Sequence, residues 1–376
     1  MIAAPSDFLG LDGVTHLAAG GQSPVLTRHL AALDRYAHVK GTGLAGQRVN
    51  EAMRTAAMAK VAALIGAAPD DIGFPSSVAH GVSVLADAIE WRPGDNVVLE
   101  GWEFPSLLYP WLAQARHGVE VRAVAPDPGG WRAPLDRFAA AVDARTRVVA
   151  VSHVSYLTGE RHDLDAYAAV ARRVGALFVV DASHALGSVR VDAPVADFLF
   201  ACCYKFLLGT HGAAIAYWNR ARVPEWRPRL TGWHSVEHRP AWEIPRQCRP
   251  LTTGQAFEPG NPAYDALYTL DGALDYLLAC GIDAIEAHTL ALSGELRARL
   301  VALGLTVMTP EPAAERAASI TFQSPQPEHV RAVLEAERVL VTGELGRVRA
   351  SVALFSTAAD IDTAARAIGA ATAQPA

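Results

Sequence analysis

Cysteine is scarce in this chain of 376 residues, with four residues at positions 202, 203, 248 and 280. Neither a CxxC nor an HExxH spacing occurs, which excludes a disulfide-rich scaffold and the common zinc sites. No hydrophobic run reaches the length of a membrane span. No basic run stands out, and 33 basic against 39 acidic residues give a net charge of −6, which argues against nucleic acid as a partner.

The start of the chain also lacks the basic and long apolar regions of a signal peptide, so we expect a reduced, cytoplasmic protein. What the sequence does contain is apolar material: 51% of its residues are hydrophobic and only 19% are charged. That composition suffices for a large core, and the length predicts two domains.

Short apolar runs alternate with helical patterns through the middle of the chain, which predicts βαβ units and a mainly parallel sheet, an α/β fold. Two long helical patterns at the N-terminal end and two after residue 262 flank this region, and a mixed α+β pattern follows. We therefore expect an N-terminal segment (1–22), a large domain (23–262) and a small C-terminal domain (263–376) that the N-terminal segment joins. The predicted strands are 96–100, 119–124, 147–152, 177–180 and 198–201.

The stretch from Leu177 to Tyr217 carries the strongest chemical signal. Two apolar runs read as buried strands, and Asp181 and Lys205 stand at or just past their ends, where open α/β sheets bind ligands. A lysine in an apolar pocket loses its proton easily and forms a Schiff base with an aldehyde. In pyridoxal 5′-phosphate (PLP) sites such a lysine carries the cofactor and an acidic partner holds the pyridine nitrogen. An isolated strand-end Asp and a surface Lys are the alternative.

The segments DASHALG and CCYKFLLGTHG resemble the class V aminotransferase branch of fold type I PLP enzymes, which includes cysteine desulfurases, isopenicillin N epimerase and kynureninase. The Asp-x-x-His and Tyr-Lys pattern is most similar to kynureninase-like members. The resemblance implies a large PLP domain with a seven-stranded type of mainly parallel sheet between helices, and a small C-terminal α+β domain. It also implies a homodimer with active sites at the interface, and catalytic roles for Asp181, His184 and Lys205.

The turn IGFPSSVAHG reads as a strand followed by a helix that serines cap, and a helix N-terminus also attracts phosphate. Simple capping is the alternative, but the family places its phosphate-binding turn here, which implicates Ser76, Ser77 and the amide of Val78. An aromatic face for the cofactor ring is expected from Phe104, with Trp102 as the fallback and plain core packing as the alternative.

Further cofactor contacts follow from the resemblance alone. It assigns a hydrogen bond with the ring hydroxyl to Tyr156, a contact with the ring hydroxyl or the aldimine to His184, and a phosphate contact to Tyr204. Cys202 aligns with a phosphate-contacting Ser, although a thiol is the poorer donor. Asn261 stands where relatives cap the partner's phosphate or approach the substrate.

Arg349 lies in GRVRASVALFST, which resembles the family motif whose arginine holds the substrate α-carboxylate. The planar guanidinium suits that task; a solvated strand face is the alternative. Trp233 and His234 are candidate specificity residues on a loop that could equally be a surface lid. Asn261 completes the expected substrate contacts.

The absence of one cysteine argues against one of the reactions known in the family. Desulfurases need a cysteine on a loop before the carboxylate-binding arginine, and VLVTGELGRVR has none. The expected function is a lyase-type cleavage at Cβ, either C–S β-elimination or a kynureninase-like C–C cleavage. A class V aminotransferase or epimerase is the main alternative, and a non-catalytic PLP-fold binding protein is the other.

Overall fold

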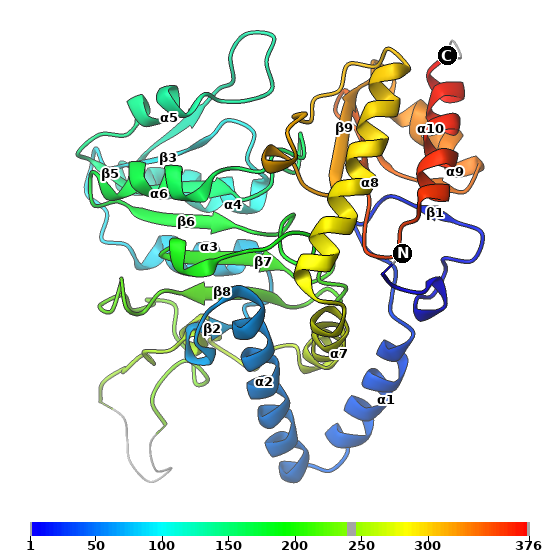
Figure 1. Cartoon of the computed structure of the whole chain (residues 1–376). Coiled ribbons are helices and arrows are strands. Elements are labelled where there is room, and N and C mark those ends of the chain that lie inside the picture. Colours follow the sequence, from blue (N-terminus) through cyan, green and yellow to red (C-terminus); the bar gives the residue numbers. More distant parts are fainter. Residues whose placement is uncertain (1, 239–245, 374–376) are drawn as a thin grey trace.

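The centre of the computed structural model is a seven-stranded sheet with the strand order β2-β8-β7-β6-β5-β3-β4 (Figure 1). All its strands run parallel except β8, which is antiparallel to β7 and β2. Only a short loop joins β7 to β8, and without a crossover helix the chain has to reverse direction. The expected mainly parallel seven-stranded sheet is therefore confirmed. Its strands are β2 (Ile72–Gly73), β3 (Asn96–Glu100), β4 (Glu120–Val124), β5 (Thr146–Ser152), β6 (Leu177–Asp181), β7 (Phe198–Cys202) and β8 (Ala214–Trp218).

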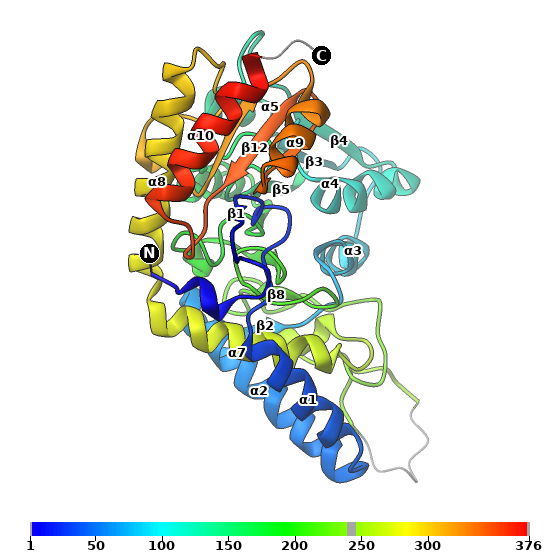
Figure 2. The same cartoon turned by 90° about the vertical axis from the view of Figure 1, so that its right-hand side faces the viewer.

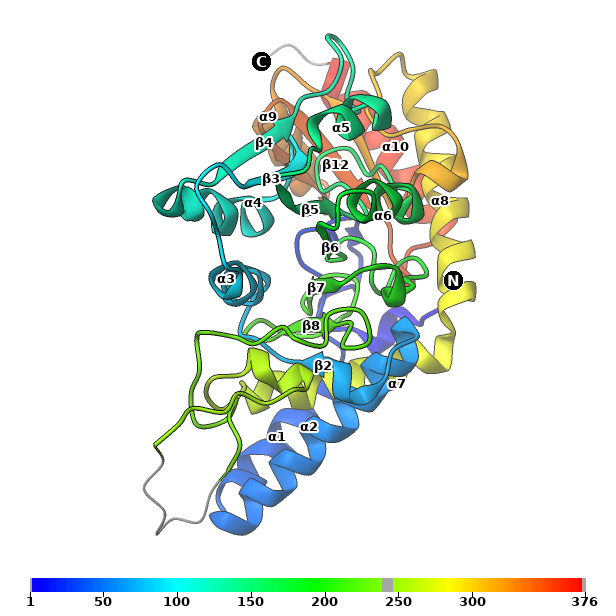
Figure 3. The same ribbon diagram turned by 90° about the vertical axis from the view of Figure 1, so that its left-hand side faces the viewer.

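Helices cover both faces of this sheet, as parallel strands buried on both sides require. Figure 3 shows α3 and α4 on one face and α5 and α6 on the other. The long helices α1, α2 and α7 pack against one another at the β2 end of the sheet (Figure 2). Their bounds are α1 (Arg28–Lys40), α2 (Leu44–Ile65), α3 (Val78–Ala88), α4 (Pro105–Leu112), α5 (Leu135–Ala141), α6 (Leu164–Arg172) and α7 (Tyr264–Cys280).

The C-terminal third builds a second, smaller layer around the antiparallel sheet β11-β12-β9. The N-terminal segment joins this layer, because β1 pairs in parallel with β10. Helix α8 runs along it and packs on α10 and β9. The elements are β1 (Thr15–His16), α8 (Ile282–Ala302), β9 (Ser319–Gln323), α9 (Pro327–Ala336), β10 (Val339–Leu340), β11 (Thr342–Glu344), β12 (Arg347–Ser351) and α10 (Ala358–Ala373).

Two glycines allow the close approaches that shape the edge of the large sheet. A Cβ on Gly81 would lie 2.7 Å from the ring of Phe200, so α3 packs directly on β7. Gly187 has φ +91°, and a Cβ there would lie 2.3 Å from the carbonyl oxygen of Phe206. The loops that follow β6 and β7 can therefore touch, which a larger side chain would prevent.

The structure describes residues 2–238 and 246–373. Within these ranges no helix has the length and apolar character to cross a membrane. The same residues contain no group of three or more His, Cys, Asp or Glu side chains that could hold a metal ion.

Candidate active site

Lys205 stands three residues beyond the end of β7, in the tight loop that leads to β8. The loop is rigidly held: the amide of Leu208 donates to the Lys205 carbonyl, and Leu208 adopts a left-handed φ of 60°. Left-handed backbone at a non-glycine residue is uncommon and persists only where the surroundings impose it. The side chain of Lys205 is only 6% exposed, and burial lowers the pKa of its amine.

The end of the neighbouring strand β6 supplies two groups that face this lysine. His184 Nε2 lies 3.0 Å from Lys205 Nζ, and burial together with the lysine charge holds the pKa of the imidazole well below its usual value. Asp181 is buried and accepts one hydrogen bond from the amide of Ser183. Burial raises the pKa of that carboxyl group, so a cation placed beside it would be bound favourably.

The N-terminus of α3 closes one end of the site. Ser77 is the N-cap residue, and its hydroxyl accepts a hydrogen bond from the amide of His80 at 3.1 Å. Ser76 lies beside it with its hydroxyl 3.1 Å from His80 Nδ1. Val78 begins the helix, whose unpaired amides and positive dipole end favour an anion.

An aromatic side chain from the turn after β3 lies over the lysine, and a second one, from the loop after β5, packs against the first. The ring centroid of Phe104 is 5.3 Å from Lys205 Nζ, and the ring of Tyr156 meets Phe104 edge-on at 5.1 Å. Trp102 instead packs against Trp131, 5.8 Å away. Of Phe104 and Trp102, Phe104 is therefore the one that faces Lys205, whose Nζ also lies 5.9 Å from the ring centroid of Tyr204.

These elements enclose a cavity of ≈ 230 Å³. The ring of Tyr204 forms part of its wall and stacks on His211 at 4.0 Å. Burial raises the pKa of the Cys202 thiol, which also lies in the wall. The lining residues are Ser76, Ser77, Val78, Phe104, Ser106, Asp181, Ser183, Cys202, Tyr204, Lys205, His211, Gly212 and Ala213.

The small antiparallel sheet, which comes from the C-terminal part of the chain, carries Arg349 near the loop after β5. Arg349, on β12, is 5% exposed and donates from Nη1 to the carbonyl oxygen of Tyr156 at 2.5 Å. A Cβ on Gly20 would lie 3.3 Å from His184 Cε1 and 2.5 Å from Ser351 Oγ. The N-terminal segment therefore passes between His184 and β12.

Three expected substrate contacts lie elsewhere within the single chain. Trp233 is 49% exposed, and Asn261 is exposed as well. His234 is buried, with its ring nitrogens 3.2 Å from Glu51 and 3.3 Å from Glu258, and these carboxylates raise its pKa to about 9 although burial opposes this. None of the three lines the Lys205 cavity, and their assigned roles stay predictions.

The fold also brings to the site several residues for which the sequence predicted no role. Ser183 accepts from the amide of Cys202 at 3.1 Å and so ties the two strand ends together. His211 covers Tyr204, and Arg347 lies over the ring of Tyr156 at 5.3 Å. A signal existed for Arg347, because it stands two residues from Arg349 and strand residues at that spacing share a face.

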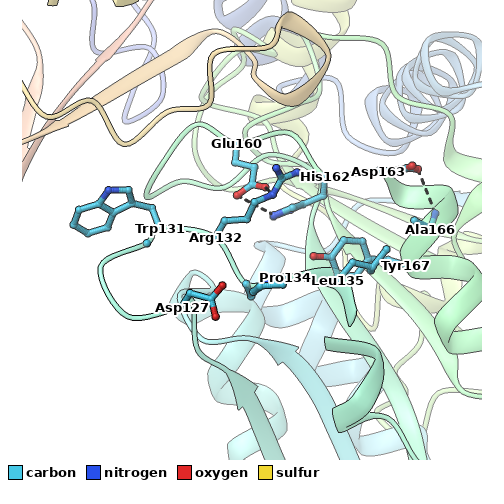
Figure 4. Close-up of a pocket in the computed structure, with 12 residues that line it drawn as sticks. Asp127, Trp131, Arg132, Pro134, Leu135, Glu160, His162, Asp163, Ala166 and Tyr167 are labelled. Atoms are coloured by element: carbon cyan, nitrogen blue, oxygen red, sulfur yellow. Dashed lines mark hydrogen bonds and ion pairs between the residues drawn. The ribbon is translucent and has the colours of Figure 1, made fainter. Parts of the chain in front are cut away.

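A larger pocket of ≈ 510 Å³ lies beside α6, and three of its lining residues, Arg132, Glu160 and His162, take part in ion pairs (Figure 4). Arg132 pairs with Glu160 at 2.5 Å and with Glu315 at 2.6 Å. His162 lies 3.3 Å from Glu100, and its pKa is raised to about 10 by that carboxylate against the effect of burial. We interpret this pocket as bordering a structural ion-pair cluster.

The residues around Lys205 fit PLP. The buried amine suits the cofactor aldehyde, and the buried carboxyl group of Asp181 in the cavity wall suits a protonated pyridine nitrogen. The capped N-terminus of α3 suits the phosphate, and Phe104 offers an aromatic surface.

Comparisons with known proteins identify the family of this chain. The family model described as aminotransferase class-V matches residues 23–364. A probable cysteine desulfurase of Methanothermobacter thermautotrophicus is 32% identical over 64% of this chain and 59% of its own length. A kynureninase of Deinococcus radiodurans is 29% identical over 73% of this chain and 67% of its own. The chain therefore belongs to the class V aminotransferase family, whose members are PLP-dependent enzymes.

A solved structure supports the fold. The cystine C–S lyase C-DES, in complex with its reaction product cysteine persulfide, superimposes with a TM-score of 0.88 over 96% of this chain and 99% of that one, at 21% identity. At this identity the similarity establishes the architecture of a fold type I enzyme. The match to the archaeal desulfurase spans less than two thirds of that relative.

Proposed function

We propose that this protein uses PLP to cleave a bond at Cβ of an α-amino acid. The observation that carries the proposal is the buried Lys205 amine, 3.0 Å from His184 and next to the wall that holds Asp181. PLP bound in this cavity would supply an electron sink for the electron pair released at Cα. Lys205, Asp181, the amides at the start of α3, Phe104, Tyr156 and Tyr204 would hold it.

Three side chains of the protein carry out proton transfer, positioning of the amine and binding of the substrate carboxylate. Lys205, whose pKa is lowered by burial, accepts the proton from Cα of the substrate. His184 is neutral because its pKa is lowered, so its Nε2 positions the lysine amine without adding charge. Arg349 grips the α-carboxylate and orients Cα toward Lys205. Burial of all three side chains excludes water from the reacting atoms.

The cysteines favour C–S elimination or C–C cleavage over transfer of sulfur to the protein. Cys202 is the cysteine in the cavity wall, and burial raises the pKa of its thiol. A protonated thiol is a poor nucleophile. Cys280 ends α7, and Cys248 lies 3.5 Å from Thr231. The kynureninase relative is consistent with chemistry at Cβ.

Steady-state product analysis separates the candidate reactions. Purified protein is loaded with PLP and given amino acids, kynurenine and cysteine S-conjugates. Continuous release of ammonia and a keto acid, or of anthranilate and alanine from kynurenine, supports the lyase. Stoichiometric release that requires an added keto acid for further turnover would identify an aminotransferase. Appearance of the D-enantiomer alone would identify an epimerase.

Attachment of the cofactor gives an independent test. Borohydride reduction should fix PLP covalently to wild-type protein, and a peptide map should place the added mass on Lys205. Lys205→Ala should lose this adduct and at least ~10³-fold of turnover, because it removes the proton acceptor. An adduct that persists at another residue would overturn the assignment. Protein that binds no PLP would support the non-catalytic alternative.

We also propose a cytoplasmic homodimer. Helices α1 and α2 expose apolar side chains, including Leu30 at 56% and Leu44 at 76%, which a second copy would cover. In such a dimer Asn261 and Trp233, both exposed here, would be available to the partner's site. Light scattering on the purified protein should give twice the chain mass of 39.9 kDa. A monomer at micromolar concentration would contradict this proposal.

A further inference from the structure

Two arginines on one face of β12 carry buried guanidinium groups with more donors than partners. Arg347 is 2% exposed and Arg349 is 5% exposed. Among the described residues, Nε and Nη2 of Arg347 and Nε of Arg349 have no hydrogen-bond partner. Arg347 Nη2 lies 3.8 Å from Glu344, whose side chain is 55% exposed, and Nη1 lies 3.4 Å from its carbonyl oxygen. Neither contact is a strong hydrogen bond.

Arg54, another buried arginine, differs because its guanidinium group meets a carboxylate directly. Arg54 donates two hydrogen bonds of 2.7 Å to Glu258, and both side chains are at most 5% exposed. Buried charges in proteins are normally paired in this way, because an unpaired one is costly. Besides the long contacts with Glu344, Arg347 has the ring face of Tyr156, 5.3 Å away, as compensation.

The excess positive charge is directed at the active site. Lys205, Arg349 and Arg347 all act on His184, whose pKa burial and these three charges hold well below its usual value. Burial and Arg347 together lower the pKa of Arg349 to about 10. Asp181 is the carboxylate of the cavity wall, and it is the expected partner of the pyridine nitrogen.

Contacts connect Arg347 to the reacting amine through two aromatic rings. Arg347 lies over Tyr156, Tyr156 meets Phe104 at 5.1 Å, and Phe104 lies 5.3 Å from Lys205 Nζ. Arg349 is tied to the backbone of the same Tyr156. A substrate held by Arg349 would therefore have Arg347 beside it on the same strand face.

We propose that Arg347 is a specificity-determining residue that selects amino acids with a second carboxylate on the side chain. This inference rests on the proposed function, in which Arg349 binds the α-carboxylate. Arg347 takes the second carboxylate in the same manner, and the substrate thereby supplies the anion that these two guanidinium groups lack. The substrate class is a dicarboxylic amino acid or a Cβ-substituted derivative that ends in a carboxylate.

Binding of unreactive acids to the PLP-loaded protein tests this without any turnover. Glutarate and butyrate have no amino group, and only glutarate has two carboxylates. Calorimetric titration of the wild type should show glutarate bound at least about tenfold tighter than butyrate, the value of one desolvated charged hydrogen bond. Malonate and succinate in the same assay report the spacing between the two arginines.

Three variants show which arginine causes the preference for glutarate over butyrate. Arg347→Met should abolish the preference for glutarate and leave butyrate binding unchanged, whereas Arg349→Met should weaken both acids. Arg331→Met changes an exposed arginine on α9 and should bind like the wild type. Should Arg347→Met fail to fold, Arg347→Lys keeps the charge, loses the planar fork, and should reduce the preference severalfold.

Equal affinity for both acids in the wild type, or a preference that survives Arg347→Met, would overturn the inference. These results are distinct from failure of the proposed function. A protein that turns over monocarboxylic amino acids with no selectivity keeps the proposed function and loses the inference. A protein that binds glutarate through Arg347 but forms no lysine-linked PLP loses the proposed function and keeps only the dicarboxylate binding.

Discussion

Glu103 stands directly before Phe104, and its side chain should make the stability of this protein depend on pH. The carboxyl group is 6% exposed and accepts a hydrogen bond from the amide of Ser152 at 2.7 Å. The Ser152 hydroxyl also donates to it. Burial and the nearby charge of Glu100 raise the pKa of Glu103 to about 8. The group is therefore mainly protonated in the folded protein at neutral pH.

The sign of the effect follows from proton binding in the two states. The unfolded chain loses the Glu103 proton near the ordinary value of 4.5, whereas the folded chain keeps it up to about pH 8. Between these values the folded state binds more protons, so its stability falls as the pH rises. The limiting slope is about 1.4 kcal/mol per pH unit, and the free energy of unfolding drops by about 2 to 3 kcal/mol from pH 5.5 to pH 7.5.

Glu103→Gln imitates the neutral acid and removes this titration. Urea denaturation of PLP-loaded wild type and variant, followed by tryptophan fluorescence at pH 5.5, 6.5, 7.5 and 8.5, gives the difference at each pH. The free energy of unfolding of the variant should rise relative to that of the wild type up to about pH 8. Above this pH the difference between the two should stay constant. Glu90→Gln, at a side chain 91% exposed, is the matched control and should show no such trend.

A difference between Glu103→Gln and wild type that does not change with pH would refute the reasoning. It would mean that the carboxyl group is ionised in the folded protein at neutral pH. A variant whose free energy of unfolding falls relative to that of the wild type as the pH rises would refute the reasoning as well. The folded state would then prefer the charged form of Glu103.

Substitutions at two further positions test the residues that support the site. Arg54→Met leaves Glu258 buried without its bidentate partner, and we expect a loss of about 3 to 5 kcal/mol in the free energy of unfolding, measured by urea denaturation; a loss below 1 kcal/mol would contradict the buried pair. Ser77→Ala removes the cap of α3 and should cost about 1 kcal/mol and weaken PLP binding. Ser77→Asp restores the cap but repels phosphate, so it should keep the stability and lower the PLP affinity; unchanged affinity in a PLP titration would argue against phosphate at this helix end.

Local patterns in the sequence predicted the parts of the site that depend on nearby residues. The strand-end positions of Asp181 and Lys205 follow from short apolar runs, and β6 and β7 end at Asp181 and at Cys202. Ser77 was predicted as a helix cap from the change of pattern after it, and it caps α3. A cap or a strand end is set within a few residues, so a single stretch of chain carries the information.

The contacts between distant segments could not be predicted in the same way. His234 was expected beside the substrate as a loop residue, and within the chain it is buried between Glu51 and Glu258. Its surroundings depend on how α2 and the segment after β8 pack, which no local pattern specifies. Glu103 had no signal in the sequence, because its unusual pKa arises from burial against β5.

By itself, then, the sequence determined the alternation of strands and helices, the mainly parallel sheet, the lysine that would carry the cofactor and the carboxylate that would face it. Only the tertiary structure decided that Lys205 meets His184 and that β12 brings two arginines to Tyr156, 193 residues away along the chain from Arg349. The physical reason is the separation along the sequence between the residues that interact. Strand ends, caps and face alternation arise from neighbouring residues. Burial, charge pairing and cavity shape arise instead from packing between segments that lie far apart in the sequence.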